Sequence, residues 1–137
     1  MAAAACSGTA WWCAALQGIA AHIANRHDAS SRAFARALSL MPAEQRCEWT
    51  DLSLWLEPTA HAKYKAIPCA SREAENARIF RLAQPLWMLS ASDISNELYA
   101  RWTISRVHSL GRIPYDMNFG RNILESQVRY GWPEAWS

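Results

Sequence analysis

The sequence predicts a single, mainly helical domain spanning residues 1–137, and three observations favour this fold class. The chain has 137 residues, 51% hydrophobic and 19% charged, so it can bury a core without a metal or cofactor. Apolar residues recur at helical spacing near the N-terminus, and prolines and capping residues divide the rest into short helical stretches. We divide the domain into a helical hairpin (9–42), a helical region (43–111) and an aromatic-rich C-terminal segment (112–137).

The first helix is expected from Thr9 to Ala24, where apolar residues follow steps of three and four. These residues are Trp12, Leu16, Ile19 and Ile23. Asn25 then favours a turn, because asparagine enters the left-handed region at low cost. A second helix is expected to start at Asp28 or a neighbour and to end at Pro42. The two helices together predict a helical hairpin.

Counted back from Pro42, this hairpin resembles a tetratricopeptide repeat. Its matches to that 34-residue motif are Gly18, Asn25, Arg26, His27, Ser30, Phe34, Ala37 and Pro42. It departs at Ala21, where the family prefers tyrosine, and at Gln17, where it prefers leucine. The resemblance implies small residues that bring two helices together around an aromatic ring. A single copy must bury its open face on the rest of the chain or on a partner.

Four further helices are expected in the region 43–111. They comprise a short helix after Pro42, one over Thr59–Ile67, one from Ser71 to about Ala83, and a longer one capped by Ser92 or Asp93 and ending at Leu110. The stretch Leu52–Leu56 is compatible with either strand or helix, because its leucines alternate with other residues. A turn is expected over Gln84–Ser92.

The C-terminal segment 112–137 differs in composition from the helices before it. Its aromatic residues are Tyr115, Phe119, Tyr130, Trp132 and Trp136. The stretch 122–130 is compatible with a short strand or one more helix. We expect an irregular segment that wraps over the helices, with a short strand as one option.

Three stretches resemble a second family. "RCEWTDLSLWLEP", "IPCASREAENARIFRLAQPLW" and "VRYGWPEAW" are similar to bacterial exported proteins of the type with a GWxTD domain. The resemblance covers residues 6–136, although no intact Gly-Trp-x-Thr-Asp is present and Arg81 stands where another aromatic is expected. It implies export, two cysteine pairs and one compact unit, and it implies no reaction.

The four cysteines are Cys6, Cys13, Cys47 and Cys69. They form no CxxC pair and have no histidine at zinc-ligand spacing, so no metal site is expected. Two alternatives remain: buried free thiols, or local disulfides pairing Cys6 with Cys13 and Cys47 with Cys69. Because disulfides persist outside a reducing cytosol, the second alternative favours a periplasmic or other extracytoplasmic location, with the cytoplasm as the alternative.

No apolar run is long enough for a transmembrane helix. The N-terminus lacks the charged leader of a signal peptide, although Ala3–Cys6 is typical of the residues around a signal cleavage site or a lipid-modified cysteine. The net charge of +2 is too small to attract a nucleic-acid backbone, so no nucleic-acid partner is expected. Membrane association through a complex stays compatible with these features.

No catalytic constellation or cofactor motif is present. The histidines, His22, His27, His61 and His108, match no metal pattern, and the chain has no GxSxG elbow and no glycine-rich phosphate loop. Eight tryptophans are an unusual surplus, and tryptophan is enriched at interface hot spots. The partner-binding candidates are Trp11, Trp12, Trp55, Trp87, Trp132 and Trp136.

The sequence therefore favours a non-enzymatic interaction or accessory subunit, with a protein partner, in an extracytoplasmic or membrane-associated assembly. The alternative is a glycan-binding module or small hydrolase that uses a Trp-lined cleft with paired carboxylates. For that alternative the candidate acids are Glu48, Asp51, Asp93 and Glu97, and the stacking platforms are Trp49 and Trp55.

Overall fold

The structure is a computed structural model that describes residues 6–83, 91–110 and 121–131. Its elements are α1 (Ala10–Ile23), α2 (His27–Leu40), α3 (Ala43–Trp49), the 3₁₀ turn η1 (Ser53–Trp55), α4 (Pro58–Lys65), the 3₁₀ turn η2 (Cys69–Ser71), α5 (Glu73–Leu82), α6 (Ala91–Leu110) and α7 (Arg121–Tyr130). These ranges contain helices and no strand. The predicted fold class, mainly helical, is confirmed.

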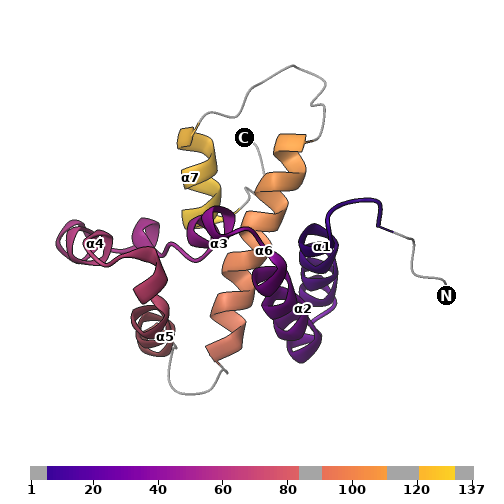
Figure 1. The fold of residues 1–137 in the computed structure, drawn as a ribbon, viewed down its shortest axis with the longest axis horizontal. Coiled ribbons are helices and arrows are strands. Elements are labelled where there is room, and N and C mark those ends of the chain that lie inside the picture. Colours follow the sequence, from indigo (N-terminus) through magenta and orange to yellow (C-terminus); the bar gives the residue numbers. More distant parts are fainter. Residues whose placement is uncertain (1–5, 84–90, 111–120, 132–137) are drawn as a thin grey trace.

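The long helix α6 runs through the middle of the molecule (Figure 1). Helices α1 and α2 pack along one side of it, whereas α4 and α5 lie on the opposite side. Helix α7 lies beside the C-terminal half of α6, and α3 crosses between the two sides. Each of the smaller elements therefore depends on α6, directly or through a neighbour, to cover its apolar face.

The hairpin of α1 and α2 forms close to the predicted boundaries. Asn25 has φ 54°, and the amide N–H groups of Asn25 and Arg26 donate to the carbonyls of His22 and Ala21. This is the Schellman arrangement, in which a left-handed residue after the helix allows the last carbonyls to be satisfied. The expected asparagine turn is therefore present, and it ends α1 and reverses the chain.

Close packing holds the two helices of the hairpin together. A Cβ atom added at Gly18 would lie 2.7 Å from the ring of Phe34, so any larger residue at position 18 would displace that ring. The Ser30 hydroxyl donates to the Gly18 carbonyl at 3.0 Å. Phe34 and Ala37 are almost fully buried. The small residues of α1 and α2 thus make room for a single aromatic ring between the helices.

Two predicted segments differ from the structure. Residues 121–130 form the regular helix α7, so the expectation of an irregular wrap with an optional strand is wrong for this part of the C-terminal segment. Val128 and Gln127 bury one face of α7, and Gly131, at φ 83°, donates its N–H to the Gln127 carbonyl as a left-handed cap. The ambiguous stretch Leu52–Leu56 contains a single 3₁₀ turn.

Helix starts in the middle of the chain also differ from expectation. Helix α5 begins at Glu73, and neither Ser71 nor its own N-cap residue, Arg72, makes a side-chain cap. Helix α6 begins at Ala91, before the predicted cap residues Ser92 and Asp93. Helix α4 forms near the predicted range Thr59–Ile67, and Pro58 occupies its first turn. The expected turn over Gln84–Ser92 falls largely outside the described residues.

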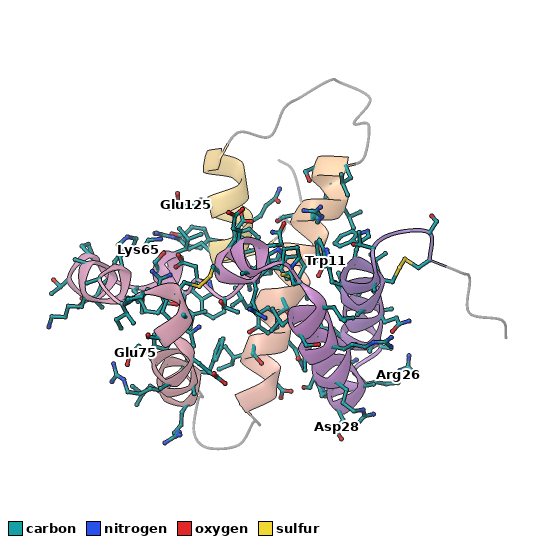
Figure 2. The ribbon with its side chains drawn as sticks, in the orientation of Figure 1. Trp11, Arg26, Asp28, Lys65, Glu75 and Glu125 are labelled. Atoms are coloured by element: carbon teal, nitrogen blue, oxygen red, sulfur yellow. A yellow bond between two sulfur atoms is a disulfide. The ribbon has the colours of Figure 1, made fainter. Side chains whose placement is uncertain are left out.

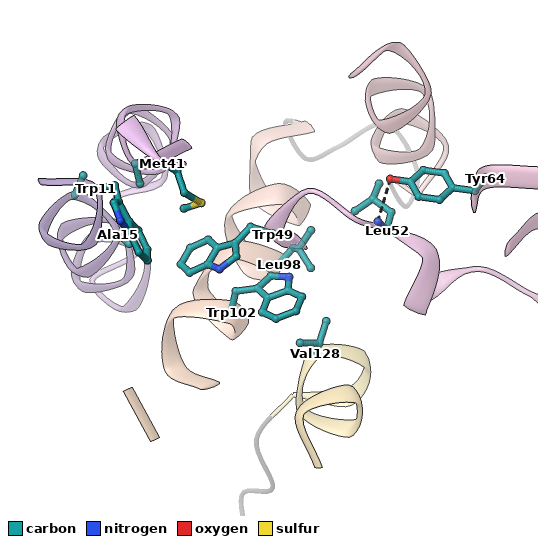
Figure 3. Packing of buried hydrophobic residues seen from close by; sticks show 11 residues of the cluster. Trp11, Ala15, Met41, Trp49, Leu52, Tyr64, Leu98, Trp102 and Val128 are labelled. Carbon is teal, nitrogen blue, oxygen red and sulfur yellow. Dashed lines mark hydrogen bonds between the residues drawn. The ribbon is translucent and has the colours of Figure 1, made fainter. Parts of the chain in front are cut away.

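Tryptophan rings fill the centre of the core (Figure 3). Trp11 meets Trp49 edge to face with ring centres 5.7 Å apart, and Trp49 stacks on Trp102 at 6.4 Å. Leu52, Leu98 and other apolar residues close around them. Among the tryptophans that the structure describes, Trp11, Trp49 and Trp102 are therefore part of the core that joins α1, α3 and α6, where burial of large rings contributes strongly to stability.

Both local disulfides are formed (Figure 2). Cys6 pairs with Cys13 and ties the N-terminal segment to α1. Cys47 pairs with Cys69 and joins α3 to η2. The described chain has no free cysteine. Of the two alternatives, the disulfides are therefore present, and such bonds need an oxidising environment.

Candidate functional site

A buried polar cluster holds α4 and α5 against the segment that follows α3. The Tyr64 hydroxyl accepts from the Leu52 backbone N–H at 3.1 Å and lies 2.8 Å from the Asn76 side-chain oxygen, to which it donates. The Asn76 amide donates to the Thr50 carbonyl at 2.8 Å. Tyr64 is 2% exposed and Asn76 9% exposed, so these bonds replace water at groups that would otherwise be buried without partners.

Asp51 adds a charged anchor to this cluster. Its carboxylate accepts from Lys65 at 2.7 Å, from Arg72 at 3.3 Å and from the Ser53 backbone N–H at 2.8 Å. Burial alone would raise the pKa of Asp51, but the hydrogen bonds from Lys65 and Ser53 outweigh it and hold that pKa below its usual value. Asp51 is therefore ionised at neutral pH and engaged in structure.

This framework leaves a groove between α2 and α3 on one wall and η2 and α5 on the other, which we call the disulfide groove. Its volume is about 650 Å³, and the Cys47–Cys69 bond forms part of its lining. The residues that line it are Leu38, Ser39, Ala43, Arg46, Cys47, Thr50, Cys69, Ala70, Arg72, Glu73, Asn76, Ala77, Phe80 and Tyr99. A groove of this size is large enough for several side chains of a binding partner.

The polar groups of the groove differ in what they already bind. Arg72 donates to Asp51 and to the Ile67 carbonyl, and its guanidinium lies 4.8 Å from the centre of the Tyr64 ring. Arg46 is exposed and forms no ion pair with any residue in the described ranges. Asp51 compensates the charge of Arg72, whereas Arg46 has no ion pair in the described ranges and favours a partner segment that places an acidic residue opposite it.

Tyr99 places its ring on the α6 side of the groove. Burial raises the pKa of Tyr99 to about 12, because the phenolate would be poorly solvated there, and the nearby Tyr64 adds to the effect. Its side chain is therefore a neutral phenol across the physiological range. With Phe80, Leu38 and Ala77 it supplies apolar surface to the groove and no acid or base for chemistry.

The predicted partner-binding tryptophans lie elsewhere. Trp11 is 8% exposed and belongs to the core, so in this fold its ring is not offered to a partner. Trp12 is partly buried, and Arg106 lies over its ring at 5.5 Å. Trp55 is partly buried too, and its N–H donates to the Val128 carbonyl at 3.2 Å. Trp87, Trp132 and Trp136 lie outside the described residues.

The candidate acids do not converge in the part of the chain that the structure describes. Glu97 pairs with His22 at 2.9 Å and with Arg101 at 2.7 Å. Asp93 pairs with His27 at 3.2 Å, and Asp51 belongs to the cluster above. Glu48 accepts from Gln45 at 2.8 Å and lines a different, smaller cavity beside Trp49. Each carboxylate therefore has a separate partner, and no pair is arranged for acid and base catalysis.

Glu97 belongs to a polar chain that spans three helices. Burial would raise the pKa of Glu97, but hydrogen bonds from Arg101 and His22 hold it below its usual value. Arg101 also donates to the Val128 and Arg129 carbonyls at 3.2 and 3.1 Å. These carbonyls lie in the last turn of α7, where a positive charge is stabilising. The chain from His22 to α7 is therefore structural.

The sequence does not predict the disulfide groove, because the walls of the groove come from segments that are distant along the chain. Phe80 lies in the helix predicted from Ser71 to about Ala83, but nothing in its neighbourhood in the sequence indicates that it meets Leu38 and Tyr99. The Cys47–Cys69 pair is the one signal that could have located the groove, since it brings α3 and η2 together.

The described residues form neither a metal site nor a membrane-spanning helix. Within the described ranges, no group of three or more histidine, cysteine or acidic side chains is arranged to hold a metal ion. None of the described helices combines the length and apolar character needed to span a bilayer. Comparison with protein-family models, with curated proteins and with solved structures finds no match to this chain.

Proposed function

We propose that this protein is a non-enzymatic interaction subunit that binds a segment of a partner protein in the disulfide groove, as part of an extracytoplasmic or membrane-associated assembly. The observation that carries the proposal is the groove itself. It combines apolar side chains with an exposed, unpaired Arg46 among the described residues, and it offers no converging acids. An occupant with one or two apolar side chains and a carboxylate opposite Arg46 satisfies both features.

Two further features support the proposal. The disulfides stabilise the protein where thiols are oxidised, which favours the periplasm or another extracytoplasmic compartment. The packing of Gly18, Ser30 and Phe34 supports a tetratricopeptide-like identity for the hairpin, a unit that would present its free face to other proteins. Export, which the resemblance to GWxTD-domain proteins implies, is compatible with both features.

Site-specific photo-crosslinking in the native host tests the groove. A photoreactive residue at Ala77, which is exposed and lines the groove, is expected to give a discrete adduct with one partner protein. The same residue at Ala62, which is exposed on α4 and outside the groove, is the matched control and should give no such adduct. Identical adducts from both positions, or none from Ala77, would contradict the proposal.

A charge reversal sharpens the same experiment. In the Ala77 crosslinking background, Arg46→Glu should reduce the adduct at least tenfold, because it repels the acidic residue of the partner. Arg36→Glu, on an exposed position of α2 outside the groove, should leave it unchanged. Light scattering after size exclusion on the purified complex then gives the oligomeric state of the assembly.

The second class, a glycan-binding module or small hydrolase, retains one supporting observation. Glu48 and Trp49 line the same cavity, which resembles the acid and stacking platform of that class. It holds no second carboxylate among its lining residues. Hydrolysis of a panel of chromogenic glycosides that is abolished by Glu48→Gln, with unchanged folding, would favour the enzyme over the interaction subunit.

A further inference from the structure

A second cavity of about 160 Å³ lies where α3, α6 and α7 meet, and we call it the indole pocket. Its lining includes Gln45 and Trp49 from α3, Trp102 and Arg106 from α6, and Gln127 from α7. Figure 3 shows the stacked rings of Trp49 and Trp102 that form part of this lining. The pocket is separate from the disulfide groove, since the two share no lining residue.

A buried N–H donor of the indole pocket lacks an acceptor. Trp102 is 7% exposed, and its indole Nε1–H is buried with no hydrogen-bond partner among the described residues. Gln127 also lines the pocket, and its Oε1 accepts from the Ser105 hydroxyl at 2.9 Å, which leaves its amide N–H groups without an acceptor in the described chain. Buried donors are almost always satisfied in native proteins, so the Trp102 N–H indicates a bound acceptor, to which Gln127 can also donate.

Arg106 adds a positive charge that forms no ion pair with a described residue. Its guanidinium lies over the rings of Trp11 and Trp12 at 4.9 and 5.5 Å, which fixes its orientation. Its Nη1 donates to the Gln45 side-chain oxygen at 3.4 Å, whereas its Nε is buried without an acceptor. No described carboxylate pairs with it. A partly buried charge without a counter-ion is costly, so the ligand that completes the pocket should be an anion.

Size and charge narrow the class of anion. A cavity of 150 Å³ holds one benzene molecule, so the indole pocket accommodates a molecule of that size at most. A guanidinium with neighbouring N–H groups matches the planar oxygens of a carboxylate. Glu48 also lines the pocket, and its negative charge disfavours multiply charged anions such as phosphate. We propose that the indole pocket binds a small monocarboxylate between Arg106, Trp102 and Gln127.

Titration of ¹⁵N-labelled protein with acetate, at constant ionic strength set with chloride, tests this site. The indole N–H resonance of Trp102, assigned with Trp102→Phe, should move downfield and saturate, and the Gln127 side-chain amide should move with it. Acetamide, which has the same shape without the charge, should produce no saturable shift. Equal shifts with acetamide and acetate, or a shift that grows linearly without saturation, would overturn the proposal.

Variants separate the site from a general salt effect. Arg106→Gln should weaken acetate binding at least tenfold, whereas Arg36→Gln, at an exposed position outside the pocket, should leave it unchanged. Gln127→Leu keeps Arg106 in place and should weaken binding about threefold to tenfold, which corresponds to about 1 kcal/mol for one hydrogen bond. Dispersion of the remaining indole resonances reports whether each variant is folded. Unchanged acetate affinity in folded Arg106→Gln protein would overturn the site.

Discussion

The two sides of α6 are held together by different means. On one side α1 and α2 pack on each other through small residues and an aromatic ring, and side-chain pairs such as His22–Glu97 and Ser31–Asn96 join them to α6. On the other side α3, α4 and α5 are short, and a disulfide, the Tyr64–Asn76 cluster and the Asp51 ion pairs hold them. Helices of seven to ten residues bury too little apolar area to be stable alone, so covalent and polar links take over.

The largest change in the free energy of unfolding is expected in the hairpin of α1 and α2. Phe34→Ala should reduce the free energy of unfolding by about 3–5 kcal/mol, because Phe34 is 1% exposed and its removal leaves a cavity. Gly18→Ala should cost about 1–3 kcal/mol, because the added methyl group overlaps the ring of Phe34. Urea unfolding measures both.

Phe80→Ala is the matched control on the other side of α6. Phe80 is partly exposed in the disulfide groove, so its loss should cost clearly less than that of Phe34. Equal losses at the two positions would show that the hairpin is not the more tightly packed side.

Removal of the disulfide between α3 and η2 should give the next largest effect. The double variant Cys47→Ser with Cys69→Ser should lose about 3 kcal/mol, because the bond closes a loop with a sequence separation of 22. Cys6→Ser with Cys13→Ser should lose less, about 2 kcal/mol, since that separation is 7. Urea unfolding under oxidising conditions compares them, and a larger loss for the N-terminal pair would contradict the assignment.

Tyr64→Phe tests the polar cluster. The change leaves two buried groups without this partner, the Leu52 N–H and the side-chain oxygen of Asn76. We therefore expect the free energy of unfolding to fall by about 1–3 kcal/mol. Tyr130→Phe, at a residue that is 76% exposed, should leave stability unchanged. If both variants are equally stable, the cluster contributes little, and the disulfide alone holds α4 and α5.

The smallest effect concerns pH, and each side of α6 has its own carboxylate. The pKa values of Asp51 and Glu97 lie below their usual values of 3.8 and 4.5, so the unfolded chain binds protons more readily at low pH. The stability they contribute is present above about pH 4.5 and is lost as the pH falls through their folded values. Asp51→Asn and Glu97→Gln should each make the free energy of unfolding depend less steeply on pH, which urea unfolding between pH 3 and 7 measures. An unchanged slope in both would contradict the ion pairs.

Much of the fold follows from local sequence. The hairpin, its asparagine turn, the proline in the first turn of α4 and the end of α6 at Leu110 are all determined by neighbours within a few residues. The helix α7 was left open between strand and helix, because short apolar patterns suit both. Its packing on α6 through Val128 resolves that ambiguity.

The candidate sites could not be predicted to the same extent. Both disulfide partners were among the alternatives considered, yet sequence alone could not tell bonded cysteines from buried thiols. Trp11 was expected at the binding surface, but it belongs to the core together with Trp49 and Trp102. Burial of a large aromatic ring is stabilising both in a protein core and at an interface. The neighbouring residues along the chain do not decide which of the two a given tryptophan occupies.

By itself, then, the sequence determined the helical class, the hairpin and the presence of an even set of cysteines, because helix periodicity, turn residues and composition act over short distances. Only the tertiary structure decided which indoles are buried, where the Cys47–Cys69 bond forms a groove wall, and that Arg106 meets Trp102 and Gln127 in one pocket. Those contacts join residues tens of positions apart, and their energies exist only once α6 has brought the two sides of the molecule together.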